Sequence, residues 1–296
     1  MRQLPTVSVI IPTRKRASVL RRAVGSVLQQ SIGSLELIVV DDNADDDQAR
    51  TDTAAAVSSF GDDRIIFIPL DAKGNAAIAR NAGIQAATSE FIAFLDDDDW
   101  FEPAKLEKQC RFLQSNPNFD GVYCGSYIKG RRILPTHEGS CFRDLMMMKT
   151  FMFTPTLMFR KEVLQSIGGF DERFERHQDY ELLAKFFRRF AIGLVPECLV
   201  NIGPNSGENR INGKSLETCK DLLLSTFHSE VSKLGASNLR KIHALHYSQV
   251  AVSYLAASDL RNFWRMLRYC IGLQPVHTFM AVGKRFTLYL RSKRAL

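Results

Sequence analysis

Short apolar runs alternate with amphipathic stretches through the first hundred residues of the chain. Four runs dominated by β-branched and apolar residues predict buried strands, at residues 7–11, 35–40, 64–69 and 90–95. Apolar side chains at helical spacing predict helices at 17–30 and 78–87. Strand, polar loop and helix follow one another in this order. The pattern therefore predicts an α/β fold with a mainly parallel, Rossmann-like sheet flanked by helices on both faces.

The second half of the chain begins with shorter elements and continues as helices. The pattern predicts a strand at 155–159 and helices at 161–167 and 180–190. From Leu216 onward the spacing of apolar residues is mostly helical. The chain therefore ends in a region without further strands.

A stretch rich in Gly, Asn and Pro, residues 203–213, separates these two patterns. We predict a domain boundary there. Residues 1–212 form the α/β domain, and residues 213–296 form a helical C-terminal appendage.

Polar residues follow three of the four early strands. They are Thr13-Arg14, Asp41-Asp42-Asn43 and the run Asp96-Asp97-Asp98-Asp99. Ligands of open parallel sheets bind beyond the carboxyl ends of the strands. We therefore expect these clusters to share one site.

The acidic run Asp96–Asp99 has two explanations. Four neighbouring carboxylates repel one another unless a cation or solvent neutralises them. Mg²⁺ or Mn²⁺ does so with one or two carboxylates and the phosphates of a substrate. The alternative is a solvated acidic turn or the start of a helix, which Asp also favours.

The composition describes an ordinary globular protein. Of 296 residues, 45% are hydrophobic and 24% are charged, which allows a sizeable core. The six cysteines form no C-x-x-C pair and no cluster with His, so we expect reduced thiols rather than disulfides or a zinc site. The chain shows neither a signal-peptide pattern nor an apolar run of about 20 residues, so we expect a cytoplasmic protein.

Basic residues are concentrated at the end of the chain. The net charge is +7, and from Ala236 onward ten Lys and Arg residues stand against one acidic residue, Asp259. Arginines alternate there with aromatic and apolar residues, at Arg261, Phe263, Trp264, Arg265, Met266, Leu267, Arg268 and Tyr269. This pattern is typical of a helix on an anionic membrane surface. A helix packed on the main domain with a solvated face is the alternative; nucleic acid is not expected, since no nucleic-acid motif accompanies the charge.

Six motifs in order resemble the family 2 inverting glycosyltransferases. They are V-S-V-I-I-P-T-R (Val7–Arg14), L-I-V-V-D-D-N (Leu37–Asn43), K-G-N-A-A-I-A-R-N-A-G-I (Lys73–Ile84), F-L-D-D-D-D-W (Phe94–Trp100), G-G-F-D-E (Gly168–Glu172) and H-Q-D-Y-E-L (His177–Leu182). The resemblance covers roughly residues 5–200. It implies a GT-A fold that binds a nucleotide-diphospho-sugar.

The resemblance also implies which residues bind the donor. They are Pro12, Thr13, Arg14, Asp41, Asp42, Asn75, Arg80, Asp96 and Asp97. An acidic residue after a strand suits the base or ribose, and a planar, permanently charged Arg suits a diphosphate. Two alternatives stay open: Asp41-Asp42-Asn43 is also a good turn sequence, and Arg80 is also compatible with a solvated helix face.

By the same resemblance, Asp98 and Asp96 match the D-x-D element. Asp98 would bind Mg²⁺ or Mn²⁺, and Asp96 would contact the ribose or reach the metal through water. Asp97 and Asp99 are less defined, and one of them is a candidate cap of the following helix.

Asp179 is the candidate general base for an acceptor hydroxyl. The family usually has Glu-Asp at this place, whereas this chain has Gln178-Asp179. His177, Gln178 and Trp100 are candidate acceptor contacts. The alternative for Asp179 is an N-cap of the helix that starts at Tyr180.

The expected function is an inverting, metal-dependent transfer from an NDP-sugar, with UDP favoured, to a saccharide or lipid-linked acceptor. Such an enzyme would build polysaccharide or glycolipid of a bacterial cell envelope, in the cytoplasm or peripherally at the inner face of the plasma membrane. A catalytically silent GT-A binding or scaffold protein is one alternative, to which only Gln178 points. A nucleotidyltransferase is another, but it would need a glycine-rich loop where this chain has Pro12-Thr13-Arg14-Lys15-Arg16.

Overall fold

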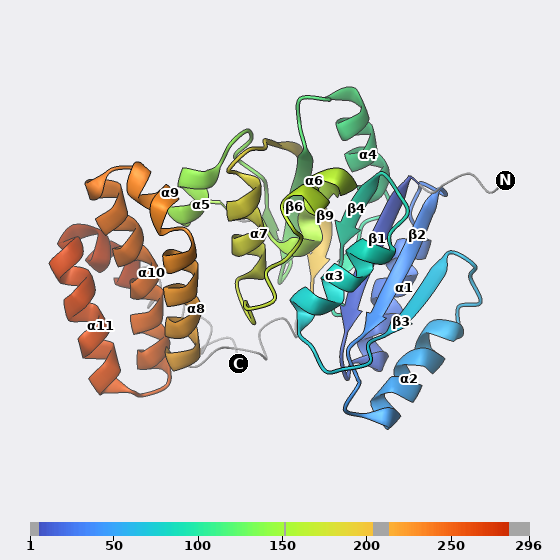
Figure 1. Cartoon of the computed structure of the whole chain (residues 1–296), viewed down its shortest axis with the longest axis horizontal. Helices are drawn as coiled ribbons and strands as arrows, with labels where there is room; N and C mark the ends of the chain where they lie inside the picture. The colour runs from blue at the N-terminus through green and yellow to red at the C-terminus, as the bar shows by residue number, and fades with distance from the viewer. Residues whose placement is uncertain (1–5, 151, 204–212, 284–296) are drawn as a thin grey trace. The chain divides into compact units, whose positions relative to one another are not determined.

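The computed structural model describes residues 6–150, 152–203 and 213–283 (Figure 1). These residues form two compact units. The first takes the chain up to Cys141 and again from Thr150 to Gly203, and the second takes Phe142–Lys149 and residues 213–283. The short segment Phe142–Lys149 thus leaves the first unit and belongs to the second. The boundary predicted near residue 212 lies outside the described residues.

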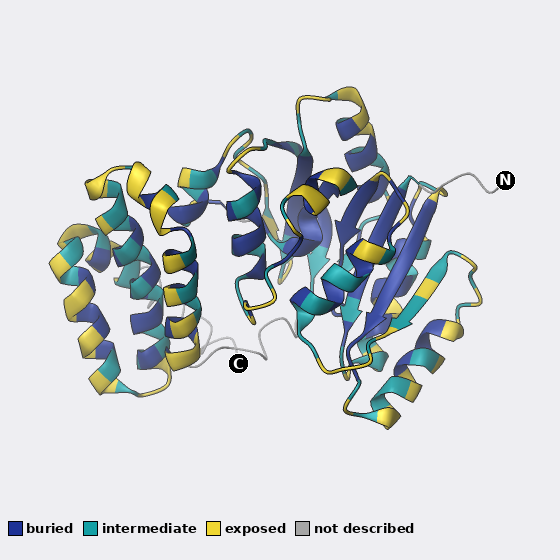
Figure 2. Ribbon diagram, viewed as in Figure 1, coloured by how far each residue is buried: buried dark blue, intermediate teal, exposed yellow. Residues whose placement is uncertain are grey.

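The first unit is built on a nine-stranded sheet. Its first half is parallel, with the order β3-β2-β1-β4; the strands are β1 Val7–Thr13, β2 Leu35–Asp41, β3 Ile65–Pro69 and β4 Phe91–Phe94. These are the four strands that the apolar runs predict. Figure 2 shows β1, β2 and β4 among the most buried parts of the unit, whereas the outer strand β3 is only partly buried.

The second half of the sheet is mixed. It continues with β8 Leu157–Arg160, β6 Gly121–Ile128, β9 Ile192–Ile202 and β5 Trp100–Phe101, with β7 Arg131–Ile133 beside β6. β6 and β9 run parallel to each other, whereas β8, β5 and β7 pair antiparallel with their neighbours. The α/β class is confirmed, and the parallel arrangement holds for the first half of the sheet. β8 overlaps the strand predicted at 155–159, whereas the antiparallel pairings of β8, β5 and β7 are an addition that the sequence pattern did not predict.

Helices cover both faces of the sheet. The helices of this unit are α1 Ala17–Leu28, α2 Asp47–Ser58, α3 Ala76–Ala86, α4 Lys105–Ser115, α6 Lys161–Ser166 and α7 Gln178–Phe186. Val9 and Ile11 of β1 lie in one core with the apolar stripe of α1. Ile10 points to the opposite face, because successive side chains of a strand alternate. There it meets α3.

Gly83 lets α3 lie directly on β1. A Cβ atom at this position would stand 2.5 Å from Cγ2 of Ile10, which is closer than side chains approach. The close approach fixes the depth of α3, the helix that carries Arg80.

The second unit is helical, as the sequence predicts. Its helices are α5 Phe142–Met146, α8 Gly213–Thr226, α9 His228–Lys233, α10 Ala236–Ala256 and α11 Leu260–Leu273, and residues 275–283 are helical as well. Buried residues of α8, α10 and α11 form its core. Nε2 of His246 lies 2.9 Å from the carbonyl oxygen of Met146, which joins α5 to α10.

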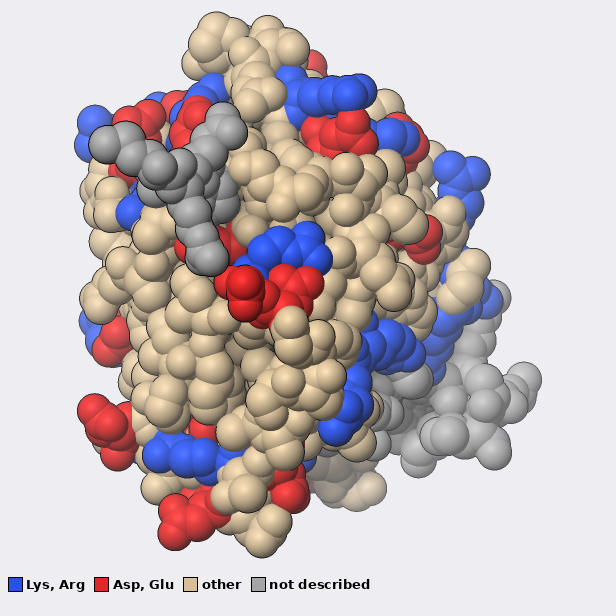
Figure 3. Space-filling model, turned by 90° about the vertical axis from the view of Figure 1, so that its right-hand side faces the viewer, with Lys and Arg blue, Asp and Glu red and all other residues tan. Residues whose placement is uncertain are grey.

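The described helices include none with both the length and the apolar character that crossing a bilayer requires. On the face drawn in Figure 3, acidic and basic side chains lie next to one another in several places and are separated by uncharged surface. Opposite charges therefore offset one another in those places, whereas basic side chains gather at the lower right of the view.

Candidate active site

The acidic run follows β4 directly. Asp97, Asp98 and Asp99 are buried, whereas Asp96 is partly exposed. The backbone turns sharply here, since the amide of Asp99 donates to the carbonyl oxygen of Asp96 at 3.1 Å. Three carboxylates are therefore withdrawn from water at the carboxyl end of a central strand.

Contacts with the end of β1 hold two of these carboxylates. Oγ1 of Thr13 donates to Oδ2 of Asp97 at 2.9 Å. Nη1 of Arg16 donates to Oδ1 of Asp97 and to Oδ2 of Asp98, each at 3.1 Å. The ends of β1 and β4 thus meet, as expected from the polar clusters. Arg16 was not among the expected site residues; the only signal for it is the basic run Arg14-Lys15-Arg16 after the first strand.

Asp99 faces the end of β9 instead of a helix. Its Oδ1 accepts a hydrogen bond from the amide of Gly203 at 2.7 Å. α4 begins after Ala104, which makes no side-chain cap. The interpretation of Asp97 or Asp99 as a cap of the following helix is therefore wrong, since that helix starts several residues later.

Arg22 of α1 also contacts the acidic run. Its Nη2 donates to the carbonyl oxygen of Asp98 at 2.8 Å, and its guanidinium lies 3.7 Å from the centroid of the Trp100 ring. A Cβ atom at Gly203 would stand 2.0 Å from the same carbonyl oxygen. Arg22 and Gly203 thus fix the backbone of the run, and neither was expected from the sequence.

Burial changes the acidity of the run. It raises the pKa of Asp97 to about 6, although Arg16 and Thr13 act in the opposite direction. Burial also raises the pKa of Asp98 against the effect of Arg16, and burial together with the charge of Asp96 raises that of Asp99. The carboxylates thus have less positive charge around them than their burial requires.

The end of β2 is occupied by contacts within the protein. Asp41 is fully buried; its Oδ2 accepts from Nε of Arg50 at 3.1 Å, and its Oδ1 accepts from the amide group of Asn43. Oδ1 of Asp42 accepts from the amide of Gly74 at 2.7 Å. A turn does begin at Asn43, since the amide of Asp46 donates to the carbonyl oxygen of Asn43 at 3.0 Å. The side chains of Asp41 and Asp42, however, bind groups farther along the chain.

Two further candidate residues for binding the sugar donor, Pro12 and Arg14, lie near these strand ends. Pro12 is paired with Val40 in the sheet register, directly before Thr13. Nη2 of Arg14 lies 3.0 Å from Oδ2 of Asp45 at a partly exposed position. Arg14 is thus held by an ion pair beside the end of β2.

Arg80 connects the acidic run to α7. Its Nη2 donates to Oδ1 of Asp96 at 2.6 Å, and its Nη1 donates to Oε1 of Gln178 at 2.5 Å. The guanidinium also lies 5.4 Å from the centroid of the Phe170 ring. Because the side chain is 7% exposed, Arg80 does not belong to a solvated helix face.

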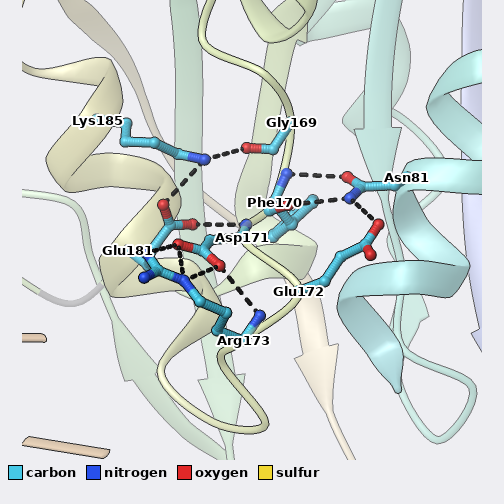
Figure 4. Close-up of polar contacts among 8 residues, drawn as sticks. All are labelled: Asn81, Gly169, Phe170, Asp171, Glu172, Arg173, Glu181 and Lys185. Carbon is cyan, nitrogen blue, oxygen red and sulfur yellow. Dashed lines mark hydrogen bonds and ion pairs between the residues drawn. The ribbon is translucent and has the colours of Figure 1, made fainter. Parts of the chain in front are cut away.

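The G-G-F-D-E segment joins α3 to α7, as Figure 4 shows. On the α3 side, the side chain of Asn81 donates to the carbonyl oxygen of Phe170 and accepts from its amide, both at 2.9 Å. Asn75 caps the start of α3 and donates to the carbonyl oxygen of Glu172 at 2.9 Å. Asn75, a candidate residue for binding the sugar donor, therefore also stabilises the start of α3 and its contact with the G-G-F-D-E segment.

On the α7 side, Glu181 and Lys185 hold the same segment (Figure 4). Oε2 of Glu181 accepts from the amide of Asp171 at 3.0 Å, and Nζ of Lys185 donates to the carbonyl oxygen of Gly169 at 2.6 Å. The two side chains form an ion pair of 2.9 Å. Burial raises the pKa of Glu181, while Lys185 lowers it.

Asp179 lies in the first turn of α7 and is partly exposed. Its Oδ1 accepts from the amide of Tyr180 at 2.9 Å. The residue at the N-cap is His177, in a left-handed conformation with φ of 58°. The interpretation of Asp179 as the N-cap is therefore wrong, because the helix begins two residues earlier than the sequence predicts.

The candidate acceptor residues differ in their environment. Gln178 is buried, and its Nε2 donates to the carbonyl oxygen of Phe174 at 2.8 Å while its Oε1 is held by Arg80. The ring of His177 packs against Tyr180 with centroids 5.7 Å apart. Trp100, stacked with Arg22, is partly exposed.

No group of three or more His, Cys, Asp or Glu side chains within the described ranges is arranged to hold a metal ion. At most, the acidic run offers a pair of carboxylates with oxygen donors suited to Mg²⁺ or Mn²⁺.

A parallel four-stranded half-sheet with acidic loops at its carboxyl edge is the arrangement of an α/β protein of the GT-A type. The family model described as Glycosyl transferase family 2 matches residues 8–190. The chain belongs to this glycosyltransferase family.

Curated relatives agree with this family. An uncharacterized glycosyltransferase of Rickettsia prowazekii is 30% identical over 210 residues, which cover 66% of this chain and 63% of the relative. The amylovoran biosynthesis glycosyltransferase AmsB of Erwinia amylovora is 28% identical over 187 residues, 59% of this chain and 62% of the relative. The chain thus spans less than two thirds of the length of these relatives.

Solved structures share the fold. TarS 1–349 of S. aureus in complex with UDP-GlcNAc is similar with a TM-score of 0.59 and 16% identity, over 91% of this chain and 92% of the other. The mannosyltransferase PcManGT of Pyrobaculum calidifontis, in complex with GDP-Man and Mn²⁺, has a TM-score of 0.55 and 18% identity, over 95% of this chain and 74% of the other.

Proposed function

We propose that this glycosyltransferase inverts the anomeric centre of a sugar that it takes from a nucleoside diphosphate, with UDP favoured. The observation that carries the proposal is the bridge made by Arg80 between Asp96, beyond β4, and Gln178, the residue before Asp179. One buried side chain thus links the acidic run to the candidate base. TarS and PcManGT, which have the same fold, were crystallised with nucleotide sugars.

The proposed donor site lies at the carboxyl ends of β1, β2 and β4. The residues proposed to form it are Pro12, Thr13, Arg14, Asp41, Asp42, Asn75, Arg80, Asp96 and Asp97. Asp41 acts indirectly, because Arg50 and Asn43 occupy its two oxygens. Arg80 supplies a fixed positive charge toward a diphosphate.

Asp98 and Asp96 are the proposed ligands of Mg²⁺ or Mn²⁺. Mg²⁺ commonly takes one or two protein carboxylates and completes its shell with phosphate and water, so a pair of carboxylates suffices. The raised pKa of Asp98 also fits, since a cation would offset its burial. When bound, such an ion acts as a Lewis acid that stabilises the negative charge of the departing nucleotide.

Asp179 is the proposed general base. It takes the proton of the acceptor hydroxyl while that oxygen attacks the anomeric carbon. The bond from this carbon to the phosphate oxygen breaks, and its electron pair leaves with the nucleoside diphosphate. Asp179 lies in the first turn of α7 and is partly exposed, which leaves its carboxylate open to an acceptor hydroxyl.

His177, Trp100 and Gln178 border the proposed acceptor side. His177 and Trp100 are partly exposed aromatic residues, which suit contact with a sugar, although Arg22 covers one face of the Trp100 ring. Both ends of the Gln178 amide are held within the protein, so Gln178 acts by positioning α7. The name of AmsB supports an acceptor in polysaccharide synthesis, and a lipid-linked saccharide of the bacterial cell envelope fits the same class.

The second unit supports a peripheral place at the cytoplasmic face of the membrane. Leu260, Trp264 and Tyr269 of α11 are exposed, and so are Arg261 and Arg268 on the same helix. Exposed aromatic and basic residues that alternate along a helix suit an anionic lipid surface. Pelleting with anionic but not with neutral vesicles, weakened in Trp264→Ser, would support this place; equal pelleting with both would oppose it.

A screen of NDP-sugars with Mn²⁺ for release of the nucleotide tests the catalytic proposal. Asp179→Asn should keep donor binding and lose about 10²-fold or more of the release rate, since a positioned base contributes about this much. Glu175→Gln, an exposed neighbour, serves as the control and should leave the rate unchanged. A wild-type rate in Asp179→Asn would place the base elsewhere. Donor binding without any turnover in the wild type would favour the catalytically silent protein.

A further inference from the structure

The guanidinium of Arg16 lies between two carboxylates of the acidic run. Its Nη1 is 3.1 Å from Oδ1 of Asp97 and 3.1 Å from Oδ2 of Asp98. Arg16 comes directly before α1, whereas the carboxylates follow β4, so the fold brings together groups more than 80 residues apart in sequence. The contact is thus a feature of the folded site and not of a local turn.

Arg16 provides the positive charge for Asp98 in the protein alone. Of the ion pairs found among the described residues, the one that Asp98 makes is with Arg16. Asp97 has a second side-chain partner in Thr13, whereas Arg16 is the one side chain that bonds the carboxylate of Asp98 among the described residues. Asp98 is also buried, so removing Arg16 without a replacement would leave its carboxylate poorly compensated.

We propose that Arg16 competes with the divalent cation for Asp98. This inference rests on the proposed function, in which Asp98 binds Mg²⁺ or Mn²⁺. An ion that binds Oδ2 of Asp98 must replace the Arg16 contact there, because two cations repel each other at one carboxylate. The protein without nucleotide therefore binds the metal weakly.

A nucleoside diphosphate relieves this competition. Its negative phosphates give Arg16 another partner of the kind that guanidinium groups bind well. The displaced side chain then contributes to donor binding. Metal and nucleotide are therefore expected to tighten each other's binding, and by linkage the two effects are equal in size.

Calorimetric titration of Mn²⁺ into the nucleotide-free protein tests the proposal. Arg16→Gln removes the competing cation and should bind Mn²⁺ at least about tenfold more tightly than the wild type, which corresponds to about 1.4 kcal/mol. Arg21→Gln is the matched control. Arg21 is an exposed residue of α1 that donates to Oγ of Ser59, so its loss changes the net charge equally without touching the run.

A second variant and a second titration guard against a simple loss of structure. Arg16→Lys keeps one positive charge but not the planar donor group, and its Mn²⁺ affinity should lie between those of the wild type and Arg16→Gln. With UDP present, the tightening of Mn²⁺ binding should be smaller in Arg16→Gln than in the wild type. Mn²⁺ affinity in Arg16→Gln equal to or weaker than that of the wild type would overturn the proposal. It would also be overturned if the Arg21→Gln control bound Mn²⁺ more tightly than the wild type by the same factor as Arg16→Gln.

Asp98→Asn separates this inference from the proposed function. If Asp98→Asn still binds Mn²⁺ like the wild type, the proposed metal site is wrong. If Asp98→Asn loses Mn²⁺ binding but Arg16→Gln does not gain any, the metal site stands and only the competition is refuted.

Discussion

Arg80 and Lys105 are both basic and buried in the first unit, but their surroundings differ. Arg80 donates to Asp96 and to Gln178. Nζ of Lys105 has no hydrogen-bond acceptor within the described residues and lies 4.1 Å from the centroid of the Phe101 ring. The charge of Arg80 is thus compensated within the proposed site, whereas Lys105 is compensated only by an aromatic face.

Burial lowers the pKa of Lys105 to about 8. Above the pKa of about 10.4 that an exposed lysine has, Lys105 is neutral in both the folded and the unfolded chain, so its ionisation does not affect stability. As the pH falls toward 8, the unfolded chain takes up the proton first. Stability is therefore lost over this range and stays low below it.

Lys105→Met should therefore stabilise the protein at pH 7, by up to about 3 kcal/mol at 1.36 kcal/mol per pKa unit. The gain should shrink as the pH rises from 8 to 10. Urea unfolding at several pH values measures it. Lys108 is a partly exposed residue of the same helix and is paired with Glu197, so Lys108→Met should change stability little. A gain that is the same at pH 7 and pH 10 would contradict the assigned cause.

The G-G-F-D-E segment is the element that ties α3 to α7. Its contacts reach Asn81 on one helix and Glu181 and Lys185 on the other (Figure 4). Arg80 and Asp179 lie on these same two helices. We therefore expect the segment to set the distance between Arg80 in the proposed donor site and Asp179, the proposed general base.

Gly169→Ala should disturb this tie more than Gly168→Ala. Both glycines have positive φ, so each substitution costs about 1–2 kcal/mol in backbone strain. A Cβ at Gly169 would also stand 2.6 Å from Oδ1 of Asn81, whereas a Cβ at Gly168 meets nothing within 4 Å. Unfolding and kcat should show a larger loss for Gly169→Ala. Equal losses for the two variants would indicate that backbone strain alone causes the loss and that the contact with Asn81 adds nothing to it.

The apolar pattern predicts the strands that are continuous and not those that are interrupted. β1, β2, β3 and β4 are short apolar runs. β9 contains Pro196, opposite a register shift between Cys124 and Gly125 of β6. Proline lacks an amide donor and is tolerated in a strand at such an irregularity. Neither the bulge nor the pairing of β6 with β9 can be read from local periodicity, because both depend on contacts far apart in sequence.

The candidate site was predictable in its position but not in its contacts. Parallel strands place Thr13 and the acidic run at one edge of the sheet, and the structure joins them through Asp97. The roles of Arg16 and Arg22 require knowledge of side chains that meet across the fold. Local spacing carries no such information.

At the scale of the whole molecule, the chain passes between its units more than once. Phe142–Lys149 belongs with the C-terminal helices, where Met146 meets His246, although it lies between β7 and β8 in sequence. A single boundary drawn from composition misses such an excursion, because the unit to which the segment belongs is decided by contacts with residues far away in sequence. The family match, residues 8–190, covers most of the first unit.

Titration of UDP into the wild type and Asp98→Ala, each with Mn²⁺ and with a chelator, tests the central claim most directly. The wild type should bind UDP at least about tenfold more tightly with Mn²⁺, a difference of about 1.4 kcal/mol. Asp98→Ala should bind UDP weakly and equally under both conditions. A wild type whose UDP affinity ignores Mn²⁺, or an Asp98→Ala variant that keeps the metal effect, would contradict a metal-dependent nucleotide-sugar site at the acidic run.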